Sequence, residues 1–299
     1  MHCCRSTFLG PLSAGLIAAL LLYSVIAQCS EFTVVQTGKS SSAAIAQLQR
    51  RAQNGDTESM FQIGIAYHQG RGIDKSDSEA AQWFRKAADR GHSGAQSSLG
   101  VLYSIGSGVP QDDSQAVAWY LRAAVAGDCT AQHNLGTMIV HQRAPRMQDS
   151  DAIRWFQKAA TNPQCAVSAY ALGVAYDLGR IVLPDPPRAA EYYKAAAEHG
   201  IAAAQFNLAL MYATGRGVPQ DTHHAIQWFE KAASALPEAE SCIALLYRKG
   251  IGITADARKA DEWMHRAGTH GLTTYPEVFP NAITPEALLA AQTQANVPR

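Results

Sequence analysis

The chain has 299 residues, of which 47% are hydrophobic and 17% are charged. This composition supplies enough apolar side chains for a packed core and argues against global disorder. Lys plus Arg and Asp plus Glu each number 25, so the sequence has no net basic charge. We therefore expect neither nucleic acid nor an anionic membrane surface as an electrostatic partner.

Residues 1–27 have the layout of a secretory signal peptide. One cation, Arg5, precedes an apolar run from Phe8 to Ala27, and the residues up to Ala27 fit a cleavage site. We expect the mature chain to start near Gln28 and to reside in the periplasm or outside the cell. Two alternatives remain open, namely an uncleaved membrane anchor and a lipid attached to Cys29.

Residues 28–54 are predicted to be a linker followed by an N-terminal capping helix. The stretch SSAAIAQLQRRAQNG (41–55) resembles a lone second helix of the repeat that follows, because Ala44 and Ala52 precede Ala80 and Ala88 by 36 residues.

A repeat of about 36 residues then recurs six times over 55–268. Three columns of residues keep step with one another. The aromatic column is Trp83, Trp119, Trp155, Tyr192, Trp228 and Trp263. The other two are Tyr67, Tyr103, Ile139, Tyr176, Tyr212 and Tyr247, and Ile63, Leu99, Leu135, Leu172, Leu208 and Ile243.

Each copy is predicted to contain two helices. In the first, Ala204, Leu208 and Tyr212 share one face at the helical period. A small residue follows the Leu/Ile column, which predicts close approach of a partner helix. G-x-G-V then ends this helix, and Ser or Asp seven residues before the aromatic column caps the second one.

A single helix pair cannot bury its apolar faces, whereas stacked pairs can, so the predicted fold class is all-α, an α-solenoid of about six helix pairs. The pattern A-x-x-x-L-G-x-x-Y-x-x-G-x-G-V-x-x-D-x-x-x-A-x-x-W-x-x-x-A-A-x-x-G closely resembles the Sel-one-like repeat (SLR) family, a branch of the tetratricopeptide-like (TPR-like) solenoids. The resemblance covers about 214 of the 299 residues. It implies a right-handed superhelix that acts as a scaffold for protein–protein contacts. Its bacterial members with signal peptides resemble envelope proteins of signalling, exopolysaccharide control or host contact.

Residues 269–299 are predicted to form a C-terminal tail with a capping helix. An extended stretch precedes a helix start at Thr284-Pro285-Glu286, and Leu288 and Leu289 would cover the last repeat. The alternative is a frayed tail.

No catalytic or metal motif occurs in the sequence, since H-E-x-x-H, G-x-S-x-G, a P-loop and C-x-x-C are all missing. We therefore predict no catalytic residues, no metal and no cofactor. Some cysteine-rich relatives of this repeat class are linked to penicillin binding, but S-x-x-K and the within-repeat cysteine pairs of that subgroup are missing here.

Cys129 and Cys165 are predicted to occupy the same position in successive repeats. Such positions on packed helices lie about 8–10 Å apart, too far for an unstrained bridge. Free buried thiols are the favoured prediction, and a disulfide requires an irregularity in repeat four. Cys242 is predicted to lie in the core.

Two surfaces are candidates for partner binding. First helices line the concave groove of TPR-like solenoids. The two residues directly before the Leu/Ile column in each repeat are therefore expected to flank a groove. The candidates there are Phe61, Gln62, His133, Asn134, Tyr170, Phe206 and Asn207. The alternative is that these aromatic side chains simply pack between helices.

The second candidate is a basic edge where repeats three and four lose G-x-G-V. It comprises Arg143, Arg146, Arg180 and Arg188, and it would receive an acidic partner or an anionic glycan. A solvated loop edge is the alternative.

The predicted function is a non-enzymatic protein–protein interaction scaffold in the cell envelope, with a regulatory or assembly role. The alternatives are a polysaccharide- or peptide-binding module and, less favoured, a hydrolase of cell-wall or β-lactam substrates. Membrane contact is expected only through an N-terminal anchor.

Overall fold

The computed structural model describes residues 42–272, and within this range every regular element is a helix. The predicted signal peptide with its anchor alternatives and the predicted C-terminal capping helix lie outside the described residues. The chain divides into two compact units, Met1–Ala123 and Ala124–Arg299. Between residues 42 and 272, none of the helices combines the length and the apolar character needed to cross a membrane.

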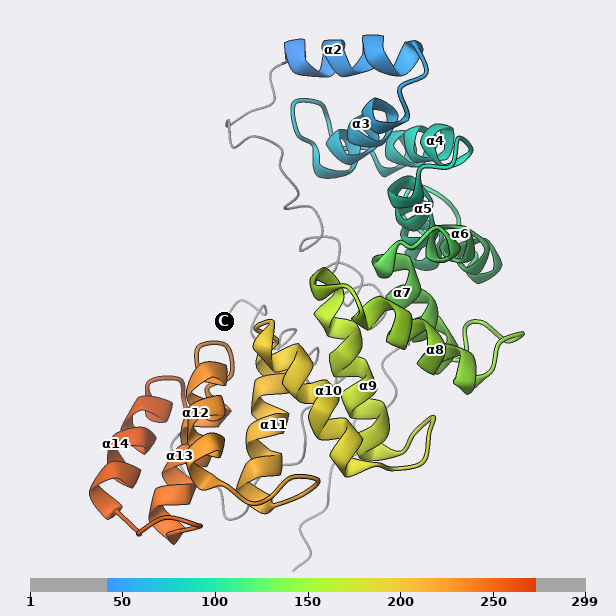
Figure 1. The fold of residues 1–299 in the computed structure, drawn as a ribbon. Helices are drawn as coiled ribbons and strands as arrows, with labels where there is room; N and C mark the ends of the chain where they lie inside the picture. Colours follow the sequence, from blue (N-terminus) through green and yellow to red (C-terminus); the bar gives the residue numbers. More distant parts are fainter. Residues whose placement is uncertain (1–41, 273–299) are drawn as a thin grey trace, which may run out of the picture. The chain divides into compact units, whose positions relative to one another are not determined.

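The first unit contains α2 (Ser42–Gln53), α3 (Thr57–Gln69), α4 (Asp77–Ala88), α5 (Ser93–Ile105) and most of α6 (Asp113–Val125). Repeat one consists of α3 and α4, and repeat two of α5 and α6. Consecutive helices pack against each other from α2 to α5 (Figure 1). Helix α2 occupies the stretch where the N-terminal capping helix was predicted.

The second unit contains four further helix pairs. Repeat three consists of α7 (Cys129–Val140) and α8 (Asp149–Ala160), and repeat four of α9 (Ala166–Leu178) and α10 (Pro186–Glu198). Repeat five consists of α11 (Ala202–Thr214) and α12 (Thr222–Ala232), and repeat six of α13 (Glu238–Lys249) and α14 (Ala257–Gly268). A short 3₁₀ helix, η1 (Pro163–Cys165), precedes α9. Consecutive helices pack against each other from α7 to α14.

Close contact between the two helices of a repeat explains the small residue after the Leu/Ile column. A Cβ atom built on Gly64, Gly100, Gly136 or Gly173 would lie 2.5–2.7 Å from an aromatic ring of the second helix. The rings belong to Phe84, Tyr120, Phe156 and Tyr193. The predicted close approach is confirmed, and it offsets the cost of glycine inside a helix.

The helix ends follow the prediction in most repeats. First helices end at a glycine in the left-handed conformation, such as Gly215 with φ 70°. The capping side chains of the second helices accept a hydrogen bond from the backbone N–H three residues later. They are Ser76, Asp112, Asp185, Asp221 and Asp256. In repeat three no glycine follows the first helix, and Gln142 takes the left-handed conformation there with a φ of 58°.

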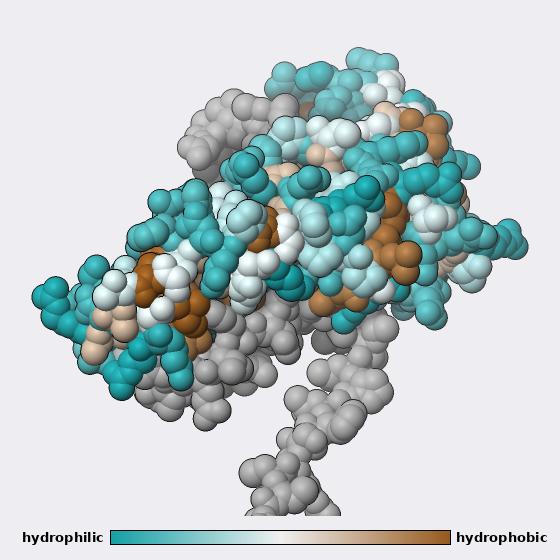
Figure 2. Space-filling model, turned by 60° about the horizontal axis from the view of Figure 1, so that its bottom comes forward, coloured by the Kyte–Doolittle hydropathy of each residue, from teal (hydrophilic) through white to brown (hydrophobic). Residues whose placement is uncertain are grey.

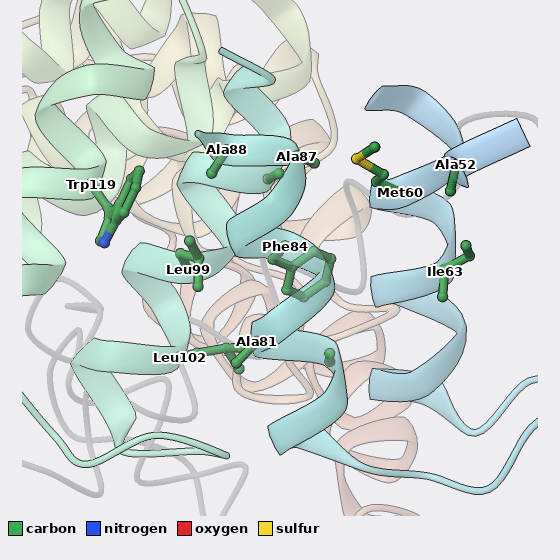
Figure 3. Close-up of a cluster of buried hydrophobic side chains, with 12 residues drawn as sticks. Ala52, Met60, Ile63, Ala81, Phe84, Ala87, Ala88, Leu99, Leu102 and Trp119 are labelled. Atoms are coloured by element: carbon green, nitrogen blue, oxygen red, sulfur yellow. The ribbon is translucent and has the colours of Figure 1, made fainter. Parts of the chain in front are cut away.

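Within each unit, the core lies between the helices of a repeat and those of its neighbour. On the face shown in Figure 2, hydrophobic residues gather only in small patches. In the first unit, Met60 and Ile63 of α3, Phe84 of α4 and Leu99 of α5 belong to one buried cluster (Figure 3). Stacking is therefore what buries the apolar face of each pair.

Candidate interaction surface

A recurrent glutamine links each of three repeats to the preceding one. The Nε2 groups of Gln96, Gln132 and Gln205 donate to the carbonyl oxygens of Ala88, Ala124 and Ala197 at 3.0–3.1 Å. Each carbonyl belongs to the last turn of a second helix and also accepts the backbone N–H of the glycine three residues later. The sequence signal was an Ala-Gln pair three residues before the Leu/Ile column, and the sequence analysis missed it.

The loop inside a repeat is fastened to the repeat before it. Arg216 of repeat five binds the buried carboxylate of Asp177 in repeat four, with Nη2 3.0 Å from Oδ2. The hydroxyl of Tyr193 donates to the same carboxylate at 3.2 Å. Burial, and then the charge of Asp177, raises the pKa of the Tyr193 hydroxyl, which therefore keeps its proton and donates.

The second glycine of G-x-G permits the loop to lie against the preceding repeat. A Cβ atom on Gly217 would lie 2.4 Å from the carbonyl oxygen of Pro186, which belongs to the preceding repeat. Gly108 comes equally close to the backbone of Asp77. In repeat six the link is a hydrogen bond of 2.7 Å from Thr222 Oγ1 to the carbonyl oxygen of Ile251. The G-x-G motifs therefore terminate a helix and also pack repeats together.

One of these links brings a serine, an aspartate and a histidine together. Asp77 Oδ1 lies 2.7 Å from His68 Nδ1, and Asp77 Oδ2 accepts a hydrogen bond from Ser107. Partial burial opposes ionisation of Asp77, but the hydrogen bonds from Ser107 and His68 outweigh it and hold the carboxyl pKa below its usual value. In a hydrolytic triad the histidine contacts the serine and takes its proton. Here the carboxylate lies between them, so the group fastens a loop.

Two of the predicted groove residues lie in the core, and the groove prediction is wrong for them. Tyr170 is 3% exposed and Phe206 is fully buried. Their ring centroids lie 6.1 Å from Tyr193 and 5.3 Å from Phe229, in the second helix of the same repeat. The aromatic side chain at this position fills the space between the two helices of its repeat. Its ring is therefore not accessible to a partner.

The other groove candidates are also engaged inside the fold. Phe61 is half-buried between Phe84 and His92, with centroid distances of 5.7 and 4.5 Å. Gln62, also half-buried, donates to Glu58 at 2.6 Å.

The polar candidates of the groove are buried or half-buried. Asn134 and Asn207 are buried, so an exposed groove position is wrong for both. His133 is half-buried, contacts Phe156 and shares a hydrogen bond of 2.9 Å with Ser168 Oγ. Burial lowers the pKa of His133 to about 4, so the imidazole is neutral at physiological pH.

The four arginines of the predicted basic edge lie in or beside two loops of the second unit. Arg143 and Arg146 lie between α7 and α8, Arg180 lies between α9 and α10, and Arg188 lies in the first turn of α10. Arg143 is half-buried and the other three are exposed. A single basic patch formed by all four stays a prediction.

Cys129 and Cys165 form a disulfide, which overturns the favoured prediction of free thiols. Their Cα atoms are 6.1 Å apart, within the usual range for a bridge. The two cysteines do not occupy equivalent positions: Cys129 is the first residue of α7, whereas Cys165 ends η1 and precedes α9. The aromatic columns of repeats three and four are one residue further apart than usual, and η1 absorbs this residue. Cys242 is buried as predicted, and burial raises its thiol pKa to about 12.

The aromatic column of the second helices carries a cation three residues later in five repeats. Lys86 Nζ lies 4.0 Å from the ring centroid of Trp83, and Lys231 Nζ lies 3.9 Å from that of Trp228. The same pairing recurs at Trp119 with Arg122, Trp155 with Lys158 and Trp263 with Arg266. Each cation covers one face of the indole, and that face is not available to a sugar.

Exposed apolar side chains are rare in the described part of the chain. The large ones are Val125, Leu178 and Leu183, which are 78%, 39% and 85% exposed. Leu178 is the last residue of α9, and Leu183 lies in the α9–α10 loop of repeat four. The sequence signal was the replacement of G-x-G-V-P by GRIVL, which the sequence analysis examined only for its arginines.

The described residues contain no group of three or more His, Cys, Asp or Glu side chains arranged to hold a metal ion. Tandem helix pairs joined by repeated polar links define the protein as a TPR-like α-solenoid.

A family model of the Sel1 repeat matches residues 57–92, 93–128, 130–163, 166–201, 202–235 and 237–272. These segments make up more than half of the chain, so the protein belongs to the Sel1 repeat family. The predicted all-α solenoid of six helix-pair repeats and the predicted family are both confirmed. Sel1 repeats are in general protein–protein interaction modules.

Two solved structures resemble the chain closely. A protective antigen present in uropathogenic Escherichia coli strains, which has an SLR fold, is 28% identical with a TM-score of 0.73, and the match covers 86% of this chain and 54% of the antigen. The present chain thus spans about half the length of that antigen. A Sel1 repeat protein from Oxalobacter formigenes is 32% identical with a TM-score of 0.63, covering 72% of this chain and 88% of that protein. No curated protein matches the chain.

Proposed function

We propose that the protein is an exported, non-enzymatic scaffold of the cell envelope that holds a protein partner in a regulatory or assembly role. The observation that carries the proposal is the set of links between successive repeats. Glutamine–carbonyl bonds, loop contacts and a disulfide hold neighbouring helix pairs in register. A surface held in this way loses little conformational entropy when a partner binds.

The export part of the proposal draws on the N-terminal sequence and on the disulfide. Disulfides persist in oxidising compartments such as the periplasm, which agrees with a chain that passes through the inner membrane. N-terminal sequencing of the protein from its own cells tests this part. A mature terminus near Gln28 is the expected result, whereas an intact Met1 in the cytoplasmic fraction contradicts it.

A polysaccharide-binding module is less favoured than a protein scaffold. Tyr170 and Phe206 are buried, and the tryptophan faces are covered by cations. These residues therefore present less open aromatic surface to a sugar than that alternative assumes.

The scaffold proposal is tested by capture of the mature chain from the envelope fraction under chemical crosslinking, followed by mass spectrometry. A stoichiometric protein partner is the expected result. Retention of glycan or peptidoglycan without a protein would contradict the proposal. Turnover of a small substrate that is lost in a folded point variant would also contradict it.

A further inference from the structure

The α9–α10 loop of repeat four matches the α11–α12 loop of repeat five residue for residue, yet its chemistry differs. Leu178 stands where repeat five has Thr214, Ile181 replaces Gly217, and Leu183 replaces Pro219. Repeat six has Thr254 at the position of Leu183. The two loops therefore have equal length, and the differences between them come from the side chains and the backbone conformation that these permit.

Ile181 prevents this loop from following the path of the repeat-five loop. Gly217 has a φ of 76° and nearly touches the carbonyl oxygen of Pro186. Among the described residues, Gln142 is the only non-glycine with a positive φ, so Ile181 does not adopt that conformation. A side chain at this position also cannot fit against the preceding repeat as Gly217 does. The residue at the position of Leu183 is exposed in repeats five and six as well, where it is Pro219 and Thr254, but in repeat four it is a leucine with 85% exposure. Leu178, which ends α9, is 39% exposed.

An arginine is held in place in the first turn of α10, directly after the loop that carries Leu183. Arg188 Nη1 donates to the Tyr176 hydroxyl at 3.2 Å, and its guanidinium lies 5.0 Å from the centroid of the same ring. The Tyr192 ring stacks on Tyr176 with a centroid distance of 5.7 Å and an interplanar angle of 7°. The Arg188 side chain still exposes 53% of its surface. A guanidinium fixed in this way can bind a carboxylate with little loss of side-chain entropy.

Between residues 179 and 188 the sequence has two arginines and one acidic residue. Arg180 and Arg188 are both exposed, and Asp185 is the only acidic residue in this loop. Asp185 Oδ1 accepts the backbone N–H of Arg188 as the cap of α10, and its Oδ2 lies 3.7 Å from Arg188 Nε. The Arg188 side chain nevertheless stays 53% exposed, and an exposed, fixed guanidinium favours an acidic ligand.

We propose that Leu178, Leu183 and Arg188 form a docking site for an acidic segment of a protein partner. The segment would carry a large apolar side chain next to a carboxylate, so that the apolar group covers the leucines and the carboxylate binds Arg188. Exposed leucines beside a fixed arginine are typical of an interface. The inference rests on the proposed function as a protein scaffold and deepens it by naming the chemistry of the partner.

A membrane surface is the less favoured occupant. One loop with two leucines and a single exposed arginine beside it gives weak attachment to an anionic bilayer, because stable binding to such a surface needs a cluster of several cations. A protein segment can add contacts with the neighbouring helix ends, which a bilayer surface cannot match.

The test uses the full chain and a displayed library of random dodecapeptides as the probe. The docking variant is Leu178→Thr with Leu183→Thr, which borrows the residues of repeats five and six. The second variant is Arg188→Gln. The matched control is Val125→Thr, which removes an equally exposed apolar side chain elsewhere. Thermal unfolding by circular dichroism checks that each variant folds.

The expected result is selection of peptides in which Asp or Glu neighbours Leu, Ile or Phe. We expect their affinity, measured by fluorescence polarisation, to fall at least tenfold in the double leucine variant and several-fold in Arg188→Gln. The Val125→Thr control should bind as the natural sequence does. Peptides without this pattern, or equal binding to the leucine variant, would overturn the proposal.

Two further outcomes separate this proposal from the scaffold function. Leucine-dependent binding to vesicles of one part phosphatidylglycerol to three parts phosphatidylethanolamine, without peptide selection, would overturn the protein partner in favour of a lipid. If the double leucine variant still captures the same envelope partner under crosslinking, the scaffold function stands and the docking site is wrong.

Discussion

The junction between repeats three and four and the junction between repeats four and five join equivalent helices by different means. At the second junction, Gln205 binds the carbonyl of Ala197, Arg216 binds Asp177, and Gly217 fits against Pro186. At the first junction, Ala169 and Ile181 stand in place of the glutamine and the glycine. There the Cys129–Cys165 disulfide and the His133–Ser168 hydrogen bond link the repeats.

The comparison teaches that one stacking geometry can be secured by several weak polar contacts or by a covalent link. Polar contacts of this kind are insensitive to reduction and, in the case of Gln205, to pH. The junction between repeats three and four depends on a disulfide and on a neutral histidine. Its stability should therefore respond to reduction of the disulfide and to protonation of His133, neither of which acts on the neighbouring junction. Four predictions test this difference.

Removal of the disulfide should have the largest effect. The variant Cys129→Ser with Cys165→Ser frees a loop of about 37 residues, and chain-entropy arguments give a loss of about 3–4 kcal/mol of unfolding free energy. Chemical denaturation of the oxidised natural protein and the variant measures the difference. Dithiothreitol should destabilise the natural protein and leave the variant unchanged. Equal sensitivity of both proteins to the reductant would show that the bridge does not act at this junction.

Loss of the arginine at the junction between repeats four and five should be the next largest effect. Arg216→Met leaves the buried carboxylate of Asp177 without its cation and should cost about 2–3 kcal/mol. Adding Asp177→Asn to this variant should recover part of the loss, because the uncompensated charge is then removed. A double variant that is less stable than Arg216→Met by the full cost of Asp177→Asn alone would indicate that the two residues are not coupled.

Acid should weaken the junction between repeats three and four through His133. The folded pKa of about 4 lies below the ordinary value of 6.5, so the neutral imidazole is favoured in the fold. The stabilisation is complete above pH 6.5 and is lost as pH falls toward 4, with a loss of roughly 1–2 kcal/mol by pH 5. His133→Phe, which has the residue of repeats one and five, should remove this slope in the pH dependence of unfolding. A slope that persists in His133→Phe would assign it to another group.

The glutamine link should have the smallest effect. Gln205→Met keeps the volume of the side chain but removes the link between the repeats, and the Ala197 carbonyl keeps the backbone N–H of Gly200 as a donor, so the cost should be at most about 1 kcal/mol. The reciprocal change, Ala169→Gln, should supply the missing donor at the junction between repeats three and four and raise the midpoint of thermal unfolding. A lower midpoint of thermal unfolding in both variants would mean that the position tolerates only its natural residue in each repeat.

The repeated residues predicted most of the fold because a periodic sequence samples the same environment six times. The columns of Trp, Tyr and Leu located every helix pair, and Ser76, Asp185 and Asp221 marked the starts of second helices. These features depend on contacts within a few residues of the chain, which the sequence alone displays. The same reasoning failed for Tyr170 and Phe206, since a helical face can point toward a partner or toward the second helix of its own repeat.

The sequence by itself determined the number of repeats, the family and the places where the pattern breaks. Only the tertiary structure decided what the breaks accomplish, because each one acts on a neighbouring repeat. The single extra residue before α9 moves Cys165 out of register and into reach of Cys129. In repeat four a leucine stands at a loop position that is exposed in repeats five and six as well, so its apolar side chain is left 85% exposed. Periodicity fixes the contacts that all repeats share, whereas the contacts that differ depend on distances between segments that the sequence does not contain.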